Sequence, residues 1–198
     1  SQYKTKQKKK KEEREDFLMS KAAILVIDGV EEVECLTVVD FCRRAGIEIT
    51  TVSVTGSRQV KGSHNIIFHT DTVFDDVNFD TFDAVIYPGG PGTAALGQAK
   101  GTRELAEKFL TGGKLVAAIC AAPGMLSETG LLKGKTATGY PGCKPEGGAV
   151  WTENTTECDG NLITGKGPGA APYFALEIIR YLEGEAKERE IHASTMMP

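Results

Sequence analysis

A regular alternation of short apolar runs with longer amphipathic stretches limits the fold more than any other feature of the chain. The runs have strand length and are apolar on both faces, as at 22–28 (AAILVID), 82–87 (FDAVIY) and 114–119 (KLVAAI). The stretch 31–45 carries acids in its first turn and arginines in its last, ahead of Gly46, which predicts a helix. Buried strands separated by helices indicate an α/β sandwich of the doubly wound type, with a mainly parallel sheet covered on both sides.

The remaining segments fit one domain, because neither an internal repeat nor a linker interrupts the alternation. Further strands are expected at 47–54 and 135–140, and helices at 102–110 and about 170–182. A hairpin is expected within 150–165, and a hairpin or a bent extended segment at 60–71. We place the domain at 21–192, between a tail at 1–20 and a short C-terminal tail at 193–198. The lysine run 8–11 could be a nucleic-acid or membrane patch, but "MSK" at 19–21 resembles a natural start, which favours an upstream tail.

Composition excludes several classes of protein. With 40% hydrophobic and 25% charged residues the chain is ordinary for a soluble globular protein, and no apolar stretch is long enough to span a bilayer. The net charge of −4 argues against nucleic acid as the main partner. The chain has 5 cysteines, which is an odd number, and no two of them form a CxxC pair. This favours reduced thiols in a cytoplasmic protein over a disulfide framework or a zinc knuckle.

Four unusual segments follow predicted strands. They are 28–34 (DGVEEVE), 87–92 (YPGGPG), Cys120 after LVAAI, and 165–171 (GKGPGAA). Ligands of a doubly wound sheet collect outside the carboxyl ends of its strands, so these segments are expected to converge on a site.

The glycine-rich segment has two interpretations. Residues 90–95 (GPGTAA) match the loose dinucleotide pattern G-x-G-x-x-G/A, but they follow a middle strand and include a proline where a backbone donor is needed. In the other interpretation, Gly89 and Gly90 let backbone N–H groups approach a reacting atom as an oxyanion hole.

Cys120 stands where an apolar strand turns sharply into a helix. A residue at such a turn projects out of the sheet, as the serine of a nucleophile elbow does. The N-terminus of the following helix favours thiolate over thiol, and the thiolate is the nucleophilic form. From composition alone, a small buried residue at a tight turn explains Cys120 equally well.

The motifs ILVIDGVEEVE, VIYPGG, AAICAAPGML and ITGKGPGAAPYFALEI together resemble the ThiJ/PfpI superfamily. More narrowly, they are similar to the branch of the Parkinson-disease protein (DJ-one). The similarity runs from about Lys21 to Leu182 in the same order and spacing. It implies a flavodoxin-like three-layer sandwich with a glutamine-amidotransferase-like nucleophile elbow, a homodimer, and neither a metal nor an organic cofactor.

The resemblance also assigns residues. It implies that Cys120 is the reactive cysteine, that the Glu34 carboxyl contacts its sulfur, and that Gly89, Gly90 and Ala121 supply backbone donors. Next to a thiolate, Glu34 should be protonated and donate a hydrogen bond to sulfur, because burial and the neighbouring charge both raise a carboxyl pKa. Without the resemblance, an acid in the first turn of a helix needs no catalytic explanation.

Three positions depart from the family pattern. Tyr140 stands where several members carry a histidine, which puts a Cys-His mechanism in doubt. Lys166 and His64 each replace an arginine, and His64 is expected near the neighbouring subunit's cysteine, as a relay or simply as an interface residue. Tyr140, Lys166 and His64 are therefore the candidate substrate-pocket residues. Cys143, in a glycine-rich loop, is a lesser candidate that could resolve an oxidised Cys120.

These residues predict a cysteine-dependent enzyme that acts on reactive carbonyls, a glutathione-independent glyoxalase or protein deglycase without a cofactor. Its substrate would be a small aldehyde or a glycated molecule, with Cys120 as nucleophile and Glu34 as proton carrier. The alternative is an oxidative-stress sensor or chaperone that works through oxidation of Cys120. A peptidase is the weaker alternative, because peptidase members place a histidine directly after the cysteine and this chain has Ala121.

Overall fold

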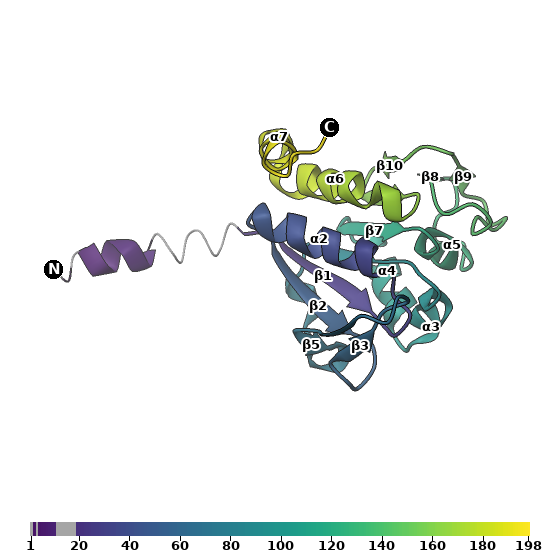
Figure 1. The fold of residues 1–198 in the computed structure, drawn as a ribbon, viewed down its shortest axis with the longest axis horizontal. Helices are drawn as coiled ribbons and strands as arrows, with labels where there is room; N and C mark the ends of the chain where they lie inside the picture. The colour runs from purple at the N-terminus through teal and green to yellow at the C-terminus, as the bar shows by residue number, and fades with distance from the viewer. Residues whose placement is uncertain (1, 3, 11–18) are drawn as a thin grey trace.

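A computed structural model describes residues 2, 4–10 and 19–198 and shows three layers, with a central sheet between two sets of helices (Figure 1). Seven strands form the sheet in the order β10-β11-β7-β6-β1-β2-β5, and all neighbours are parallel except β10 and β11. The strands are β1 (Lys21–Val26), β2 (Glu48–Ser53), β5 (Thr72–Val73), β6 (Ala84–Tyr87), β7 (Leu115–Ile119), β10 (Thr156–Asp159) and β11 (Leu162–Gly165). The predicted fold class is confirmed.

The helices divide between the two faces of the sheet according to the alternation of side chains along the strands. Ala22, Ile24 and Val26 of β1 face a core shared with α2, α6 and α7, whereas Ala23 and Leu25 face a core shared with α3, α4 and α5. The helices are α2 (Glu32–Arg44), α3 (Thr93–Gln98), α4 (Thr102–Thr111), α5 (Ala122–Ser127), α6 (Ala171–Glu183) and α7 (Glu185–Ser194). Both faces of the central strands are buried, which explains their continuous apolar runs.

The predicted hairpins are present. Strands β3 (Gln59–Lys61) and β4 (Ile67–His69) pair antiparallel beside the main sheet, and β10 pairs with β11 around Gly160, whose φ is +59°. Short 3₁₀ turns lie at η1 (Phe74–Asp76), η2 (Phe79–Thr81) and η3 (Pro168–Ala170).

Two expectations need correction. The strand expected at 135–140 is reduced to β8 (Thr136–Ala137), which pairs with β9 (Val150–Trp151), because the chain then turns so that the Tyr140 amide reaches the Cys120 carbonyl. Residues 193 and 194, which were expected to belong to a C-terminal tail, are the last residues of α7. Ile191 of this helix packs into the core. The tail expected at 1–20 falls partly on residues 1, 3 and 11–18, which lie outside the described residues, while residues 4–10 are helical.

The order of connections places a switch point between β1 and β6. The chain passes from β1 to β2 on one side and returns to β6 on the other. The loops after β1 and β6 therefore meet at the carboxyl edge of the sheet, where the Gly92 amide donates to the Gly29 carbonyl and the Glu31 amide donates to the Gly89 carbonyl. In the described part of the chain, none of the helices has the length and apolarity needed to cross a membrane.

Candidate active site

Cys120 lies between β7 and α5 in a backbone conformation that is rare for a residue with a side chain. Its φ is +66°, and two neighbouring segments hold it there. The Cys120 amide donates to the Gly165 carbonyl at the end of β11 (2.9 Å), and the Cys120 carbonyl accepts from the Tyr140 amide (2.8 Å). A strained residue fixed at both backbone groups is typical of a functional turn.

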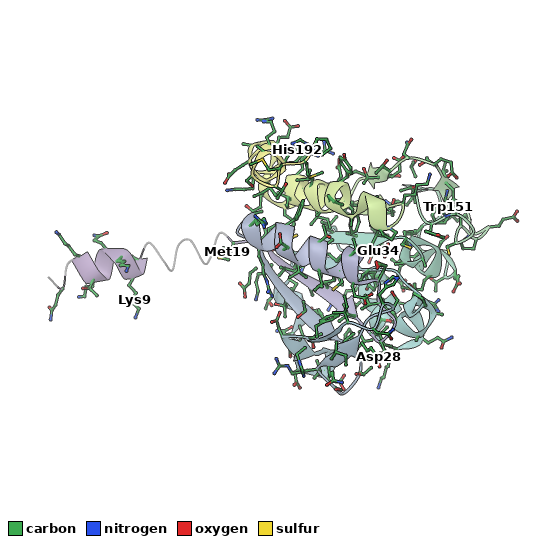
Figure 2. All side chains as sticks on the ribbon, in the orientation of Figure 1. Lys9, Met19, Asp28, Glu34, Trp151 and His192 are labelled. Atoms are coloured by element: carbon green, nitrogen blue, oxygen red, sulfur yellow. The ribbon has the colours of Figure 1, made fainter. Side chains whose placement is uncertain are left out.

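Glu34 reaches this turn from the first part of α2. Its side chain is fully buried, and its Oε1 accepts a hydrogen bond from the Gly89 amide at 3.0 Å. The carboxyl also lies beside the Cys120 side chain and influences the thiol pKa, while its second oxygen, Oε2, is buried without a hydrogen-bond partner among the described residues. Figure 2 shows Glu34 on the helix that crosses the sheet, beside the ends of the central strands. The structure thus places the Glu34 carboxyl and the Cys120 side chain next to each other, and the roles expected of them stay predictions.

Burial sets the electrostatics of this pair. It raises the pKa of the Glu34 carboxyl to about 7, and the charge of Glu31 raises that pKa further against opposing hydrogen bonds from Cys120 and Gly89. Burial also raises the pKa of the Cys120 thiol to about 12, together with the charge and hydrogen bond of Glu34. The amides of Ala121 and Gly90 lower the thiol pKa but do not outweigh these effects.

These pKa shifts do not support the expected resting thiolate, which stays a prediction. Helix α5 has only 6 residues, and its N-terminus does not offset desolvation and a neighbouring carboxylate. The structure favours a thiol that donates to an ionised carboxylate over a thiolate beside a neutral acid. The sulfur can still become nucleophilic if Glu34 accepts its proton during attack.

The three expected backbone donors have different roles. Gly90 and Ala121 direct their amides to the Cys120 sulfur, whereas the Gly89 amide is engaged by Glu34. Gly89 thus holds the carboxyl rather than serving as an open oxyanion donor. Its own position needs glycine, because an added Cβ would lie 2.6 Å from the Cys120 Cβ and 2.8 Å from the Glu34 Oε1.

The dinucleotide interpretation of residues 90–95 finds no support. The Gly92 amide donates to the Gly29 carbonyl and the Thr93 amide donates to the Gly90 carbonyl. A Cβ on Gly92 would lie 2.3 Å from the Asp28 carbonyl oxygen. The turn therefore packs against the loop after β1, and these amides are not free to bind a pyrophosphate.

Two grooves lie near the elbow, although neither Cys120 nor Glu34 is among their lining residues. One of about 500 Å³ includes Ala121, Arg103 and Cys143 in its lining, and one of about 370 Å³ includes Tyr140, Lys166 and Tyr173. Tyr140 and Lys166, both expected in the pocket, thus line one groove. The half-buried Cys143 lines the other groove.

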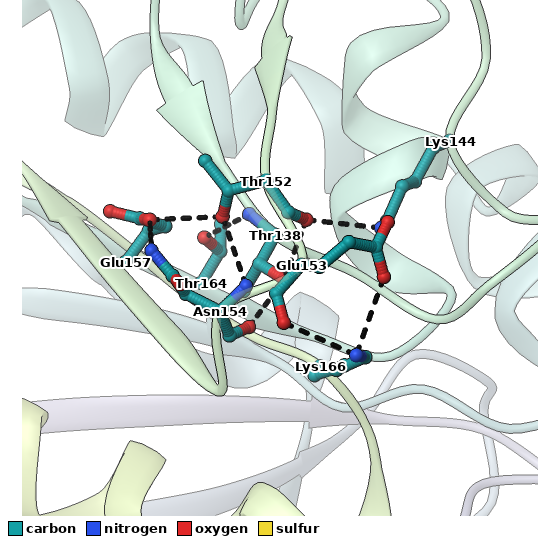
Figure 3. Close-up of polar contacts among 8 residues, drawn as sticks. All are labelled: Thr138, Lys144, Thr152, Glu153, Asn154, Glu157, Thr164 and Lys166. Atoms are coloured by element: carbon teal, nitrogen blue, oxygen red, sulfur yellow. Dashed lines mark hydrogen bonds and ion pairs between the residues drawn. The ribbon is translucent and has the colours of Figure 1, made fainter.

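Sequence reasoning missed the residues that orient Lys166. Glu153 accepts a hydrogen bond from Lys144 and forms ion pairs with both Lys144 and Lys166 (Figure 3). Lys166 also donates to the Glu153 carbonyl at 3.2 Å. The hydrogen bond from Lys144 and the two lysine charges lower the pKa of Glu153. Because Lys144 and Lys166 are far from each other in the sequence, no periodic pattern predicts that both contact Glu153. The contacts are seen only in the folded structure.

His64 lies in neither groove. It is in the turn between β3 and β4, with its side chain 73% exposed and its Nδ1 near Glu31 and Glu32. Glu32 fastens this turn, because its carboxylate accepts from the amides of His64 and Ile66 and from the Ser63 hydroxyl. Burial would raise the pKa of Glu32, but these hydrogen bonds lower it to about 2.

The other cysteines divide by burial. Cys35 and Cys42 lie in the core, where burial raises the pKa of each thiol to about 12. Cys158 is exposed on β10, where burial of part of its surface and the charge of Glu177 raise its pKa.

Comparison with known proteins identifies relatives of the whole domain. Residues 20–181 match the model of the DJ-1/PfpI family. The chain is 40% identical to protein dj-1beta of Drosophila melanogaster over 178 residues, which cover 87% of this chain and 95% of the fly protein. It is 31% identical to a deglycase of Pyrococcus abyssi over 81% of this chain and 98% of that protein. It is 30% identical to a glutathione-independent glyoxalase of Caenorhabditis elegans over 86% of this chain and 94% of that protein.

Solved structures agree in fold. The crystal structure of fly DJ-1beta superposes with a TM-score of 0.86 at 37% identity, covering 91% of this chain and 99% of that one. The structure of oxidized Toxoplasma gondii DJ-1 gives a TM-score of 0.83 at 28% identity, covering 89% and 98%.

Proposed function

Because this chain belongs to the DJ-1/PfpI family, we propose that it is a cysteine-dependent enzyme of the glutathione-independent glyoxalase or deglycase type. The observation that carries the proposal is the contact between the Cys120 thiol, on a strained elbow, and the fully buried Glu34 carboxyl. The names of the nematode glyoxalase and the archaeal deglycase support the same reaction class.

The geometry suggests how a small aldehyde would react. The Cys120 sulfur forms a bond to the aldehyde carbon while the thiol proton passes to Glu34, and the carbonyl oxygen takes the electron pair. The Gly90 and Ala121 amides, which point at the sulfur, are placed to stabilise that oxygen. Protonation of the oxygen gives a hemithioacetal.

With methylglyoxal, the same carboxyl would complete an isomerisation. After giving the thiol proton to the carbonyl oxygen, Glu34 is ionised again and removes the hydrogen from the carbon bonded to sulfur, which leaves an enediolate. A proton returned to the neighbouring carbon, with transfer of the hydroxyl proton from the first oxygen to the second, converts the hemithioacetal into a thioester of lactate. Water then cleaves the thioester, releasing lactate and restoring the thiol. One water is consumed and no net oxidation occurs, so the balance requires no redox partner.

Methylglyoxal consumption without glutathione tests the proposal. We expect turnover in the wild-type protein and its loss in Cys120→Ala, with Cys158→Ala as the matched control because Cys158 is an exposed cysteine away from the elbow. No consumption by the wild type, or consumption unaffected by Cys120→Ala, would contradict the enzyme proposal.

A redox sensor is the second candidate function. The amides of Gly90 and Ala121 and the Glu34 carboxyl surround the sulfur where the oxygens of a sulfinate would lie. The Toxoplasma gondii relative is known in an oxidized form. Mass spectrometry after mild peroxide treatment would then show two added oxygens on Cys120. Negligible aldehyde turnover together with that product would favour the sensor over the enzyme.

We also propose that the protein forms a homodimer through an apolar patch on α2 and the β3–β4 hairpin. The patch consists of Val33, Leu36, Ile66 and Ile67, all exposed in the single chain. The Ile66 amide donates to Glu32, which holds the hairpin part of the patch beside α2. Exposed apolar residues gathered in this way are typical of an interaction surface, and a second copy presents the same surface.

Sedimentation velocity tests this assembly. We expect wild-type protein to sediment as a dimer, Leu36→Glu to shift it toward the monomer, and Val150→Glu to leave it unchanged. Val150 is an exposed apolar residue outside the patch. A monomeric wild type, or a dimer indifferent to Leu36→Glu, would contradict this surface.

A further inference from the structure

Tyr140 and Lys166 flank the elbow that carries Cys120. The Cys120 amide donates to the Gly165 carbonyl at 2.9 Å, and Lys166 is the next residue along the chain. On the other side of the elbow, the Tyr140 amide donates to the Cys120 carbonyl at 2.8 Å. Tyr140 and Lys166 also line the same groove of about 370 Å³. A ligand that lies in this groove is therefore close to both the Lys166 side chain and the elbow.

Glu153 already occupies the Lys166 ammonium. Lys166 Nζ donates to the Glu153 carbonyl at 3.2 Å and forms an ion pair with the Glu153 carboxylate, whose Oε2 lies 3.3 Å away (Figure 3). The other carboxylate oxygen, Oε1, pairs with Lys144. Both contacts of the Lys166 ammonium thus go to one residue, which an anionic ligand would have to displace.

Stability gives little reason for this arrangement. The Glu153 side chain is 74% exposed, and exposed ion pairs stabilise a fold only slightly. Lys144 does not depend on Glu153 alone, because it also donates to the Thr152 carbonyl at 3.0 Å. Hydrogen bonds from Lys144 and Lys166 lower the pKa of Glu153, so its carboxylate is ionised near neutral pH. A fixed negative charge therefore stands beside the groove.

We propose that Glu153 is a positioning residue that sets the charge selectivity of the Cys120 site. It withholds the Lys166 ammonium from an anionic ligand, and its own charge repels such a ligand. The site then favours a neutral electrophile, such as an uncharged aldehyde, over one that carries a carboxylate. Glu153 and Lys166 lie outside the apolar patch on α2 and the β3–β4 hairpin that is proposed for the homodimer. The inference rests on the proposed function for the kind of electrophile, but its electrostatic effect on Cys120 is measurable without turnover.

Alkylation of Cys120 by iodoacetate and by iodoacetamide tests the inference. The two reagents have nearly the same size and differ in charge, so the ratio of their rates reports charge selectivity rather than thiol reactivity. Mass spectrometry of the Cys120 peptide gives this ratio in wild type, Glu153→Gln and the matched control Glu146→Gln. Glutamine at 153 keeps the backbone carbonyl and a side-chain oxygen and removes only the charge, whereas Glu146 is an exposed acid that lines neither groove.

We expect the iodoacetate-to-iodoacetamide ratio to rise about 3–10-fold in Glu153→Gln, the effect of one unit charge a few ångströms away in a largely solvated site. The ratio should keep its wild-type value in Glu146→Gln. When Lys166→Gln is added to Glu153→Gln, no ammonium is released, so the ratio should equal that of Lys166→Gln alone.

Three results would overturn the role of Glu153. They are a ratio unchanged in Glu153→Gln, an equal rise in Glu146→Gln, and a rise that persists when Lys166→Gln is present. Methylglyoxal assays on the same proteins separate this inference from the proposed function. A shifted ratio without turnover overturns only the enzyme proposal, and turnover with an unshifted ratio overturns only the role of Glu153.

Discussion

The Cys120 thiol and the Glu34 carboxyl are two acids buried against each other, so the pair holds one negative charge more easily than two. The location of that charge decides the mechanism. A carboxylate beside a thiol makes Glu34 a general base, whereas a thiolate beside a neutral acid makes Cys120 a preformed nucleophile. The raised thiol pKa favours the first arrangement.

The pH dependence of turnover distinguishes these arrangements. Because the pKa of Glu34 is raised to about 7 and a general base must be ionised, we expect kcat/KM to rise through about pH 7. Steady-state rates between pH 5 and 9 measure this profile. If kcat/KM falls as Glu34 loses its proton, the other arrangement, a neutral Glu34 beside a Cys120 thiolate, is supported instead.

Glu34→Gln should separate thiol acidity from activity. The amide keeps an oxygen that can accept from Gly89 but removes the charge that raises the Cys120 pKa. We expect the thiol pKa, measured by pH-dependent alkylation, to fall while turnover falls by about 10²–10⁴, the usual contribution of a general base. Glu48→Gln, at an exposed acid on β2, is the control. An unchanged thiol pKa would show that the two groups do not interact.

The same substitution should change stability in a pH-dependent way. The Glu34 pKa is raised from 4.5 to about 7 in the folded state, so its favourable contribution is complete below pH 4.5 and is lost as pH rises through 7. Glu34→Gln should therefore gain up to about 3 kcal/mol in unfolding free energy relative to wild type between pH 5 and 8. Urea denaturation of the wild type and Glu34→Gln at pH 5 and at pH 8 measures this difference in unfolding free energy. An equal difference between the two proteins at both pH values would contradict the raised pKa of Glu34.

At the scale of elements, the sequence predicts segments that carry their own end signals. Helix α2 has acids in its first turn, arginines in its last and Gly46 at φ +77°, and its predicted bounds differ from the observed ones by one residue at each end. Helix α7 was missed because it follows Gly184 and buries only Ile191. Its amphipathic signal is therefore too weak to recognise.

The glycine turn after β6 gives a prediction about packing. A Cβ on Gly89 would lie 2.6 Å from the Cys120 Cβ and 2.9 Å from the Ile119 carbonyl oxygen, so the backbone or the nucleophile must shift. Gly89→Ala should lose activity and about 1–3 kcal/mol of stability, as overpacked cores do. Gly56→Ala, where a Cβ meets nothing within 4 Å, is the control. Equal stability of the two variants would show that the turn accommodates a methyl group.

At the scale of the molecule, the site is assembled from segments that no local pattern connects. Glu34 and Gly89 are 55 residues apart, and Glu32 and His64 are 32 apart. The sequence could predict that strand ends converge on one edge, because parallel topology requires it. The pairing of thiol and carboxyl came from family resemblance, and the two lysine contacts of Glu153 from the fold alone.

The different burial of the cysteines predicts that they differ in how fast they are alkylated. Exposed Cys158 should be alkylated readily in native protein, while Cys35 and Cys42 should react only as the core opens. Their protection, measured by mass spectrometry at increasing denaturant, should follow the global unfolding free energy. Modification of either core thiol well before unfolding would indicate that α2 detaches locally.

The positive φ at Cys120 makes this residue a point of backbone strain in the scaffold. Glycine would adopt this conformation without the steric penalty of about 1 kcal/mol or more that a side chain incurs. A Cys120→Gly protein should then outlast a Cys120→Ala protein under heat, although both lack the sulfur. If Cys120 serves the proposed chemistry, the protein retains that thiol at a cost in backbone strain.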